Sequence, residues 1–158
     1  MKDSLRTGIT FGLTSGTITT LGLMVGLYSG THSRKAVIGG ILTIAVADSF
    51  SDALGIHISE ESENVHTTRQ IWTATIATFL SKLFFALIFV IPVLLFDLQT
   101  SVIINLVWGV SVLTILSYFM AKSQGEAPWK VILEHLIIIA VVIILTHFVG
   151  NVIASFVE

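Results

Sequence analysis

Long apolar runs separated by short polar segments are the dominant pattern of this chain. A run of roughly 20 apolar residues is long enough to cross the hydrocarbon core of a bilayer as a helix. The polar breaks between the runs are too short to hold a second domain. The pattern predicts an all-α membrane protein with a single transmembrane domain over residues 1–158, with helices at about 8–28, 36–59, 71–96, 101–121 and 129–157 and an interruption of the third helix at Pro92.

The composition agrees with this interpretation and excludes several other classes. Hydrophobic residues make up 54% of the chain and charged residues 11%, whereas a soluble domain carries about 25% charged residues. The net charge of −2 argues against a nucleic-acid partner. The absence of cysteine excludes disulfides, thiolate metal ligands and a cysteine nucleophile. We expect no enzymatic activity.

The N-terminal apolar stretch follows Lys2 and Arg6, as it would in a secretory signal peptide. It continues from Gly8 to Gly30 without a clear cleavage site, so we interpret it as the first transmembrane helix.

The basic residues predict the orientation, because cytoplasmic loops carry an excess of Lys and Arg. With the N-terminus in the cytoplasm, Arg34 and Lys35 lie outside and six basic residues lie on or near the inside. Five helices then place the C-terminus outside, and we expect an integral protein of a prokaryotic cytoplasmic membrane. The six inner residues are Lys2, Arg6, Arg69, Lys82, Lys122 and Lys130.

Glycines recur every fourth residue in the first helix, and this spacing lets helix backbones approach closely in lipid. We expect the two sets to point in different directions and the helix to contact more than one neighbour. Packing within the chain and a dimer contact remain two open interpretations. The two sets are Gly8, Gly12 and Gly16, and Gly22, Gly26 and Gly30.

Two aspartates stand out in the second helix, Asp48 near the bilayer centre and Asp52 about 6 Å closer to the cytoplasm at a rise of about 1.5 Å per residue. Their i,i+4 spacing puts both carboxylates on one face. Acidic residues at this depth cost roughly 2.5 kcal/mol or more and mark function. Lys82 in the third helix is expected to lie at a shallower depth, and an ion pair between it and one aspartate stays open as an alternative.

Hydroxyl groups of the first helix fall at matching depths, Ser15 level with Asp52 and Thr19 level with Asp48. Together with Ser51, these groups predict an oxygen-lined site for a divalent cation. Burial also favours protonated carboxyls, so the same groups would carry protons in exchange. The alternative is that the hydroxyls bond carbonyls of their own helix, an alternative that is favoured for Thr19 alone.

The segment after the second helix, SEESENVHTTRQ, forms an acidic mouth on the predicted cytoplasmic side. Its residues Glu60, Glu61, Glu63 and His66 would raise the local concentration of cations. Glu63 and His66 match the Glu-x-x-His spacing of helical di-iron sites, although a solvated acidic loop is the favoured interpretation. Glu134 is a secondary candidate, and interhelical hydrogen bonds are expected for His57, Asn105, His135, His147 and Asn151.

These motifs resemble the vacuolar iron transporter family, which includes nodulin-like proteins and bacterial and archaeal relatives. Residues 15–26, SGTITTLGLMVG, are similar to that family's DG-x-x-x-x-LGLVxG signature. Residues 51–63, SDALGIHISEESE, are similar to its SMAxGEYxS signature and the acidic stretch that follows. The segment ATFLSKLFFALIFVIPVLLF resembles its proline-containing third helix. The resemblance covers nearly the whole chain through degenerate motifs.

The resemblance implies a five-helix homodimer that exports ferrous iron or manganese against protons, along a path at the dimer interface lined by the first two helices. Ser15 falls at the family's helix 1 aspartate, Asp52 at its helix 2 methionine, and Ile56 at the glutamate of its GEY motif. Asp48 falls at a small residue. The chain therefore departs from the family at its carboxylates, and residues 60–70 stand where the plant proteins have a cytoplasmic metal-binding domain.

We therefore predict a dimeric, proton-coupled transporter of Fe²⁺ or Mn²⁺ in the lipid bilayer, with no prosthetic group. The alternative is a non-transporting scaffold or assembly subunit whose aspartates pair with a basic partner helix. An intramembrane aspartyl protease is disfavoured, because such chemistry normally takes its two carboxylates from different helices.

Overall fold

The computed structural model describes residues 2–157, which form helices joined by short turns. Five helical spans are long and apolar enough to cross a membrane, and the third consists of two helices in succession. This agrees with the predicted all-α membrane architecture. The helices are α1 (Lys2–Thr31), α2 (Arg34–Ser62), α3 (Thr68–Ile88), α4 (Val90–Leu95), α5 (Leu98–Gln124) and α6 (Pro128–Val157).

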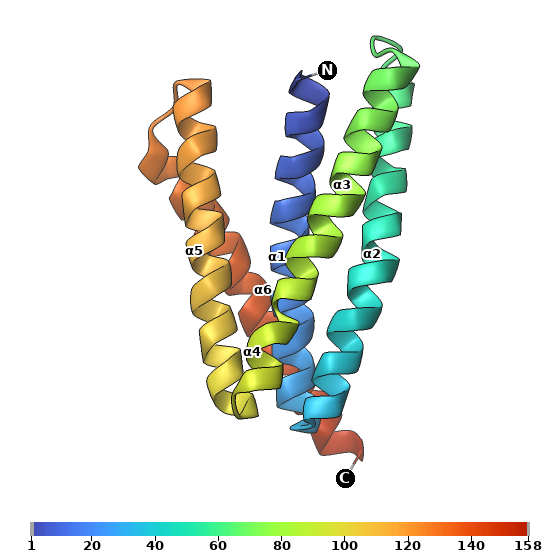
Figure 1. Ribbon diagram of the computed structural model, residues 1–158. Coiled ribbons are helices and arrows are strands. Elements are labelled where there is room, and N and C mark those ends of the chain that lie inside the picture. The colour runs from blue at the N-terminus through green and yellow to red at the C-terminus, as the bar shows by residue number, and fades with distance from the viewer. Residues whose placement is uncertain (1, 158) are drawn as a thin grey trace.

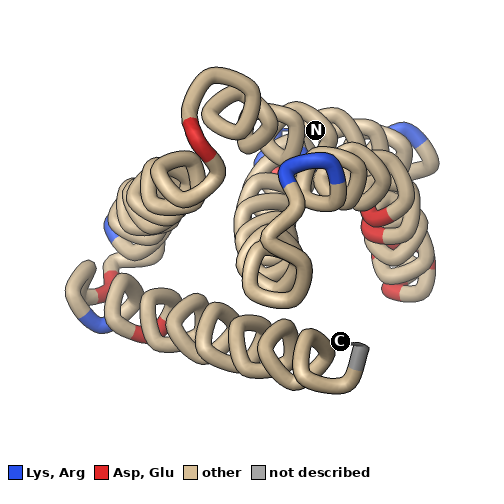
Figure 2. Tube along the Cα trace, turned by 90° about the horizontal axis from the view of Figure 1, so that it is seen from below, with Lys and Arg blue, Asp and Glu red and all other residues tan. Residues whose placement is uncertain are grey.

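The spans alternate in direction, so the two ends of the chain lie at opposite ends of the bundle (Figure 1). The turn between α2 and α3 and the turn between α5 and α6 lie at the N-terminal end. The turns after α1 and after α4 lie at the other end. Most of the helical length carries neither acidic nor basic residues (Figure 2), as a lipid environment requires.

The helices are longer than the apolar runs that predicted them. The first begins at Lys2 rather than near Gly8, and the connection expected over residues 60–70 shrinks to residues 63–67. Hydropathy marks only the part of a helix that lies in lipid, whereas capping groups decide where the hydrogen-bonded turns end. The caps are Ser33 for α2, Thr67 with Gln70 in a capping box for α3, Asp97 for α5, and Gly125 (φ 74°) after α5.

The third span breaks at Phe89, one turn before the proline that predicted an interruption. Proline lacks an N–H group and its ring clashes with the carbonyl four residues earlier. For Pro92 that residue is Ile88, where α3 ends. The Asn105 side chain of α5 donates a 2.9 Å hydrogen bond to the Phe89 carbonyl, at the break between α3 and α4. The interhelical role predicted for Asn105 is therefore confirmed.

Helix α1 occupies the middle of the bundle and contacts α2, α3, α5 and α6. Helix α6 starts beside α5 and passes obliquely behind α1 (Figure 1). The glycines of α1 pack within the chain. A Cβ added to Gly8 would lie 2.7 Å from the Ala77 Cβ of α3, and one added to Gly30 would lie 3.1 Å from the Gly150 carbonyl of α6. The first glycine set thus contacts α3 and the second contacts α6, as expected of a central helix.

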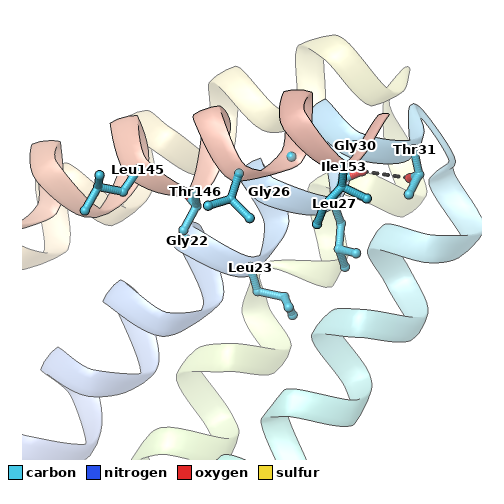
Figure 3. A pocket seen from close by; sticks show the side chains of 11 residues that line it. Gly22, Leu23, Gly26, Leu27, Gly30, Thr31, Leu145, Thr146 and Ile153 are labelled. Atoms are coloured by element: carbon cyan, nitrogen blue, oxygen red, sulfur yellow. Dashed lines mark hydrogen bonds between the residues drawn. The ribbon is translucent and has the colours of Figure 1, made fainter. Parts of the chain in front are cut away.

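An apolar crevice of about 320 Å³ follows the second glycine set, between α1 and α6 (Figure 3). Gly22, Gly26 and Gly30 form one wall, and Thr146 and Val149 lie on the other. The Thr146 hydroxyl is bonded to the carbonyl of Val142 in its own helix. The crevice therefore offers no unpaired hydroxyl there, and we assign it to packing.

Candidate functional site

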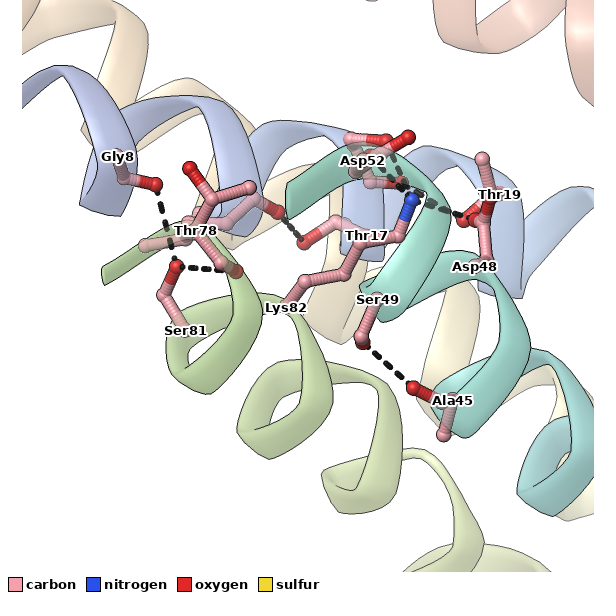
Figure 4. Close-up of polar contacts among 12 residues, drawn as sticks. Gly8, Thr17, Thr19, Ala45, Asp48, Ser49, Asp52, Thr78, Ser81 and Lys82 are labelled. Atoms are coloured by element: carbon pink, nitrogen blue, oxygen red, sulfur yellow. Dashed lines mark hydrogen bonds and ion pairs between the residues drawn. The ribbon is translucent and has the colours of Figure 1, made fainter. Parts of the chain in front are cut away.

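The candidate site is a charge cluster in which the Lys82 ammonium of α3 lies between the two aspartates of α2 (Figure 4). Its Nζ is 2.5 Å from the Oδ2 of Asp48, and it donates a hydrogen bond to the Oδ2 of Asp52. It also donates a 2.8 Å hydrogen bond to the Ser15 hydroxyl of α1. Three helices thus converge on one buried ammonium, whose side chain is 1% exposed.

The cluster lies halfway along the bundle. The centre of α2 falls at Asp48 and the centre of α1 falls between Gly16 and Thr17. The centre of the third span falls next to Lys82, between Ser81 and that residue. The shallow depth expected for Lys82 is therefore wrong, because the residue lies within two residues of the centre both of the predicted run over 71–96 and of the observed span Thr68–Leu95.

Glycine in α1 makes room for the lysine. A Cβ on Gly16 would lie 3.2 Å from both the Cγ and the backbone carbonyl of Lys82. One on Gly12 would lie 2.6 Å from the Thr78 carbonyl of the same helix. The absence of a Cβ at these two glycines lets the lysine stem run between α1 and α3, with its charged end at Ser15. The glycine pattern and the buried charge are therefore parts of one arrangement.

The carboxylates, unlike the ammonium, are partly open to the outside of the monomer. The Asp48 and Asp52 side chains are 25% and 19% exposed. Their Oδ2 atoms contact Lys82, whereas their Oδ1 atoms make no hydrogen bond within residues 2–157. The Oδ2 of Asp48 is itself buried, so the exposed part of that side chain lies on its other atoms. Each aspartate therefore keeps one oxygen free for a further cation or proton.

The two remaining predicted ligands lie nearby without joining the cluster. The Thr19 hydroxyl donates a 2.9 Å hydrogen bond to the Ser15 carbonyl, which is the alternative that the sequence favoured for it. Ser51 is exposed on α2 and makes no side-chain hydrogen bond within the described residues. The lysine contact is thus made by Ser15, Asp48 and Asp52 alone.

A stripe of small residues runs along the open face of α2 beside the aspartates. Its members recur at i,i+4 and all are exposed. A Cβ added to Gly39 or Gly55 would meet nothing within 4 Å, in contrast to the packed glycines of α1. Small residues at this spacing are typical of close helix–helix contacts in lipid. The stripe consists of Gly39, Thr43, Ala47, Ser51, Gly55 and Ser59.

In the predicted acidic mouth, Glu60 and Glu63 lie against His66 of the same segment. The His66 Nε2 lies 3.4 Å from the Oε2 of Glu60 and 3.2 Å from the Oε2 of Glu63. Glu61 is exposed. Since the ring nitrogen itself occupies the space between the two glutamates, the Glu-x-x-His match at Glu63 forms an intramolecular contact. Within residues 2–157, no three His, Asp or Glu side chains are grouped so that they could hold a metal ion.

The secondary candidates divide into structural contacts and one unpaired residue. His57 contacts the Thr75 hydroxyl at 3.0 Å, His135 contacts the Ser117 hydroxyl at 2.6 Å, and His147 contacts the Ser29 hydroxyl at 2.5 Å. These interhelical hydrogen bonds confirm the predictions for the three histidines. Asn151 instead bonds His147 within α6. Glu134 is exposed and makes no ion pair among the described residues.

The central depth of Lys82 and the stripe of small residues on α2 were not predicted from the sequence. For the lysine, the useful signal was its place at the centre of the third apolar run. For the stripe, the signal was the unbroken i,i+4 recurrence of small residues. No known family model, curated protein or solved structure matches this chain. The resemblance to the vacuolar iron transporters therefore stays a prediction.

Proposed function

We propose that this protein is a proton-coupled transporter of a divalent transition metal, Fe²⁺ or Mn²⁺, with Asp48 and Asp52 as its cation-binding groups. The observation that carries the proposal is the mid-membrane pair of aspartates whose Oδ1 atoms remain unpaired beside Lys82. Ionisable residues inside a bilayer are costly and are characteristic of ion pathways. Oxygen ligands of this kind suit hard and borderline divalent cations.

The charges of the cluster support a mobile cation. Two carboxylates and one ammonium leave one net negative charge when all three groups are ionised. Such a charge at the centre of a bilayer is unfavourable unless a further cation balances it. A metal ion or a proton on the free Oδ1 atoms would supply that balance, so the two would compete for the same place. Competition of this kind is the basis of exchange between a metal and protons.

The stripe on α2 supports a homodimer. A second copy packed against Gly39 and Gly55 would cover an otherwise open face of small residues. Two-fold symmetry would bring the two clusters toward each other, since the aspartates lie beside the stripe. The two residual negative charges would then match one divalent cation. In this arrangement Ser51, within the stripe, would lie close to the ion.

The direction of transport follows from the predicted orientation, with the N-terminal end of the bundle in the cytoplasm. Lys82 lies at the centre of its span and is therefore left out of the count. The basic residues then number five against two rather than six against two, and the N-in orientation is still favoured. The glutamates Glu60, Glu61 and Glu63 lie at that same end and would attract cations from the cytosol. We therefore propose export from the cytosol.

The scaffold alternative requires a basic helix of a partner protein to pair with the aspartates. Lys82 of the same chain already pairs with both of them, so a foreign basic helix would have to balance only the one remaining negative charge. This weakens the scaffold alternative.

Metal flux into proteoliposomes tests the proposal. Purified protein should move Mn²⁺ or Fe²⁺ down a metal gradient, with opposite movement of protons detected by an internal pH dye. Asp48→Asn and Asp52→Asn should each lower the initial rate by at least about tenfold, because each removes a charge that binds the cation. Glu126→Gln, an exposed acidic residue in the turn after α5, is the matched control and should retain the wild-type rate. Equal flux in all four proteins would reject the site, and no flux in any of them would reject metal transport.

A further inference from the structure

We infer that Lys82 is a resident counter-ion that sets both the affinity and the valence preference of the Asp48–Asp52 site. The inference rests on the proposed cation transport and adds a specificity-determining residue to it. Nothing in the resemblance described above supplies this lysine with a role.

The geometry fixes the ammonium in place. Lys82 contacts Asp48 and Asp52 from α2 and Ser15 from α1 (Figure 4). The two aspartates are the charged groups that face it within the described residues, and its side chain is 1% exposed. The stem lies against Gly16, which leaves little room for withdrawal toward α1. The ammonium therefore stays beside the site whether or not a cation is bound on the Oδ1 side.

A fixed positive charge weakens the binding of any cation next to it. Coulomb repulsion is proportional to the charge of the incoming ion, so a divalent ion loses twice as much as a monovalent ion. Expressed as a net charge, the same ammonium brings the cluster from two negative charges to one. Its presence therefore reduces affinity in general and divalent affinity most of all.

Weakened binding has a use in transport. A site that carries ions must bind them well enough to take them up and weakly enough to release them. Two bare carboxylates in a low-dielectric region would hold a divalent ion tightly. Lys82 would shift the site from retention toward release, which fits a transporter better than a storage or structural metal site.

The test compares Mn²⁺ binding and transport in wild type and Lys82→Met, an apolar change of similar length. Mn²⁺ affinity is measured by isothermal titration calorimetry in detergent, with and without Na⁺ as a monovalent competitor. The Kd for Mn²⁺ should fall by at least about tenfold in the variant, and the preference for Mn²⁺ over Na⁺ should rise. Turnover in proteoliposomes should fall, because release becomes slow. A protein in which Lys82 has only a structural role would not gain affinity.

Two further variants control for charge and folding. Lys82→Arg keeps the charge and should keep the Mn²⁺ Kd within about threefold of wild type, well inside the tenfold change above. The double variant with Asp48→Asn and Lys82→Met restores one net negative charge and should return the Kd toward the wild-type value. If Lys82→Met does not fold, that double variant compared with Asp48→Asn alone still shows whether removal of the lysine raises affinity.

The outcomes separate this inference from the proposed function. Wild-type protein that neither binds nor transports Mn²⁺ or Fe²⁺ would overturn the proposed function. Wild-type protein that binds and transports Mn²⁺, together with a folded Lys82→Met variant of equal or weaker affinity, would overturn the counter-ion role alone.

Discussion

The Nζ of Lys82 and the Oδ2 of Asp48 lie 2.5 Å apart at the centre of the membrane-spanning bundle. The same ammonium bonds Asp52, so one lysine is shared by two carboxylates from successive turns of α2. Removing one carboxylate leaves the ammonium paired, whereas removing both leaves it with the Ser15 hydroxyl alone. The energetic effects of the two aspartates should therefore depend on each other.

We predict non-additive effects of Asp48→Asn and Asp52→Asn on stability. Each single change should lower the free energy of unfolding by about 1–2 kcal/mol, since one charged hydrogen bond is replaced by a weaker one. The double change should lower the free energy of unfolding by about 3–5 kcal/mol, more than the sum of the two single changes, because it leaves a buried ammonium without a carboxylate. Unfolding in mixed detergent and SDS micelles measures these values, and a double-mutant cycle gives the coupling.

The control for this cycle is the triple variant that also carries Lys82→Met. Removing the stranded charge should recover most of the stability lost in the double variant, because the cluster is then uncharged. Strictly additive single effects, or no recovery in the triple variant, would contradict a shared ammonium.

Close packing at the glycines of α1 gives a second prediction. Gly12→Ala should lower the free energy of unfolding by about 1–3 kcal/mol, because its Cβ would lie 2.6 Å from the Thr78 carbonyl and force α1 and α3 apart. Gly39→Ala on α2 meets nothing within 4 Å and is the matched control. It should leave the stability of the monomer unchanged or slightly raised, since alanine is the better helix former. Equal losses in both variants would contradict the contact at Gly12, because a Cβ added at Gly39 has no neighbour to meet.

The fold was more predictable than the site. Apolar runs marked all five spans, because lipid imposes one simple requirement on every helix. Helix ends were less predictable, since caps such as Ser33 and Asp97 act beyond the apolar core. Asp48 and Asp52 were recognisable from their depth. Their pairing with Lys82 was predicted only as an open alternative and for one aspartate, whereas the lysine contacts both. The pairing depends on how α2 and α3 are placed side by side, and hydropathy along one chain does not contain that information.

Cysteine cross-linking tests the proposed dimer face directly, because the chain contains no cysteine. Ser51→Cys and Gly55→Cys lie on the exposed stripe of α2 and should form disulfide-linked dimers in membranes when an oxidant is added. Ile144→Cys, exposed on α6, is the control and should remain monomeric. Cross-linking at Ile144 but not at Ser51 would place the dimer contact on another helix and would remove the support for a shared cation.

Labelling with a membrane-impermeant thiol reagent tests the orientation. Gln99→Cys lies in the first turn of α5, at the C-terminal end of the bundle, and Glu126→Cys lies in the turn after it, at the other end. The excess of basic residues at the N-terminal end predicts that Gln99→Cys reacts in intact cells and Glu126→Cys only after permeabilisation. The reverse pattern would invert the topology and change the proposed direction from export to uptake.

The cap of α5 gives a pH-dependent prediction outside the membrane. Thr100, through its hydroxyl and then through its backbone N–H, holds the pKa of Asp97 below its usual range. The backbone bond from Thr100 to the Asp97 carboxylate is 2.9 Å. A depressed folded-state pKa means that the stabilising effect is present above the unfolded-state pKa and is lost as the pH falls through the folded-state pKa.

Thermal unfolding of wild type and Asp97→Ala should therefore differ at neutral pH and converge in acid, below the ordinary aspartate pKa of 3.8. Asp97→Asn is the informative control, because asparagine caps a helix as well as aspartate but has no charge to lose. Its advantage over Asp97→Ala should persist in acid. A wild-type advantage that also persists at low pH would mean that the cap acts through hydrogen-bond geometry alone, whereas equal stability of all three proteins at neutral pH would mean that packing of α4 against α5 holds this turn without the cap.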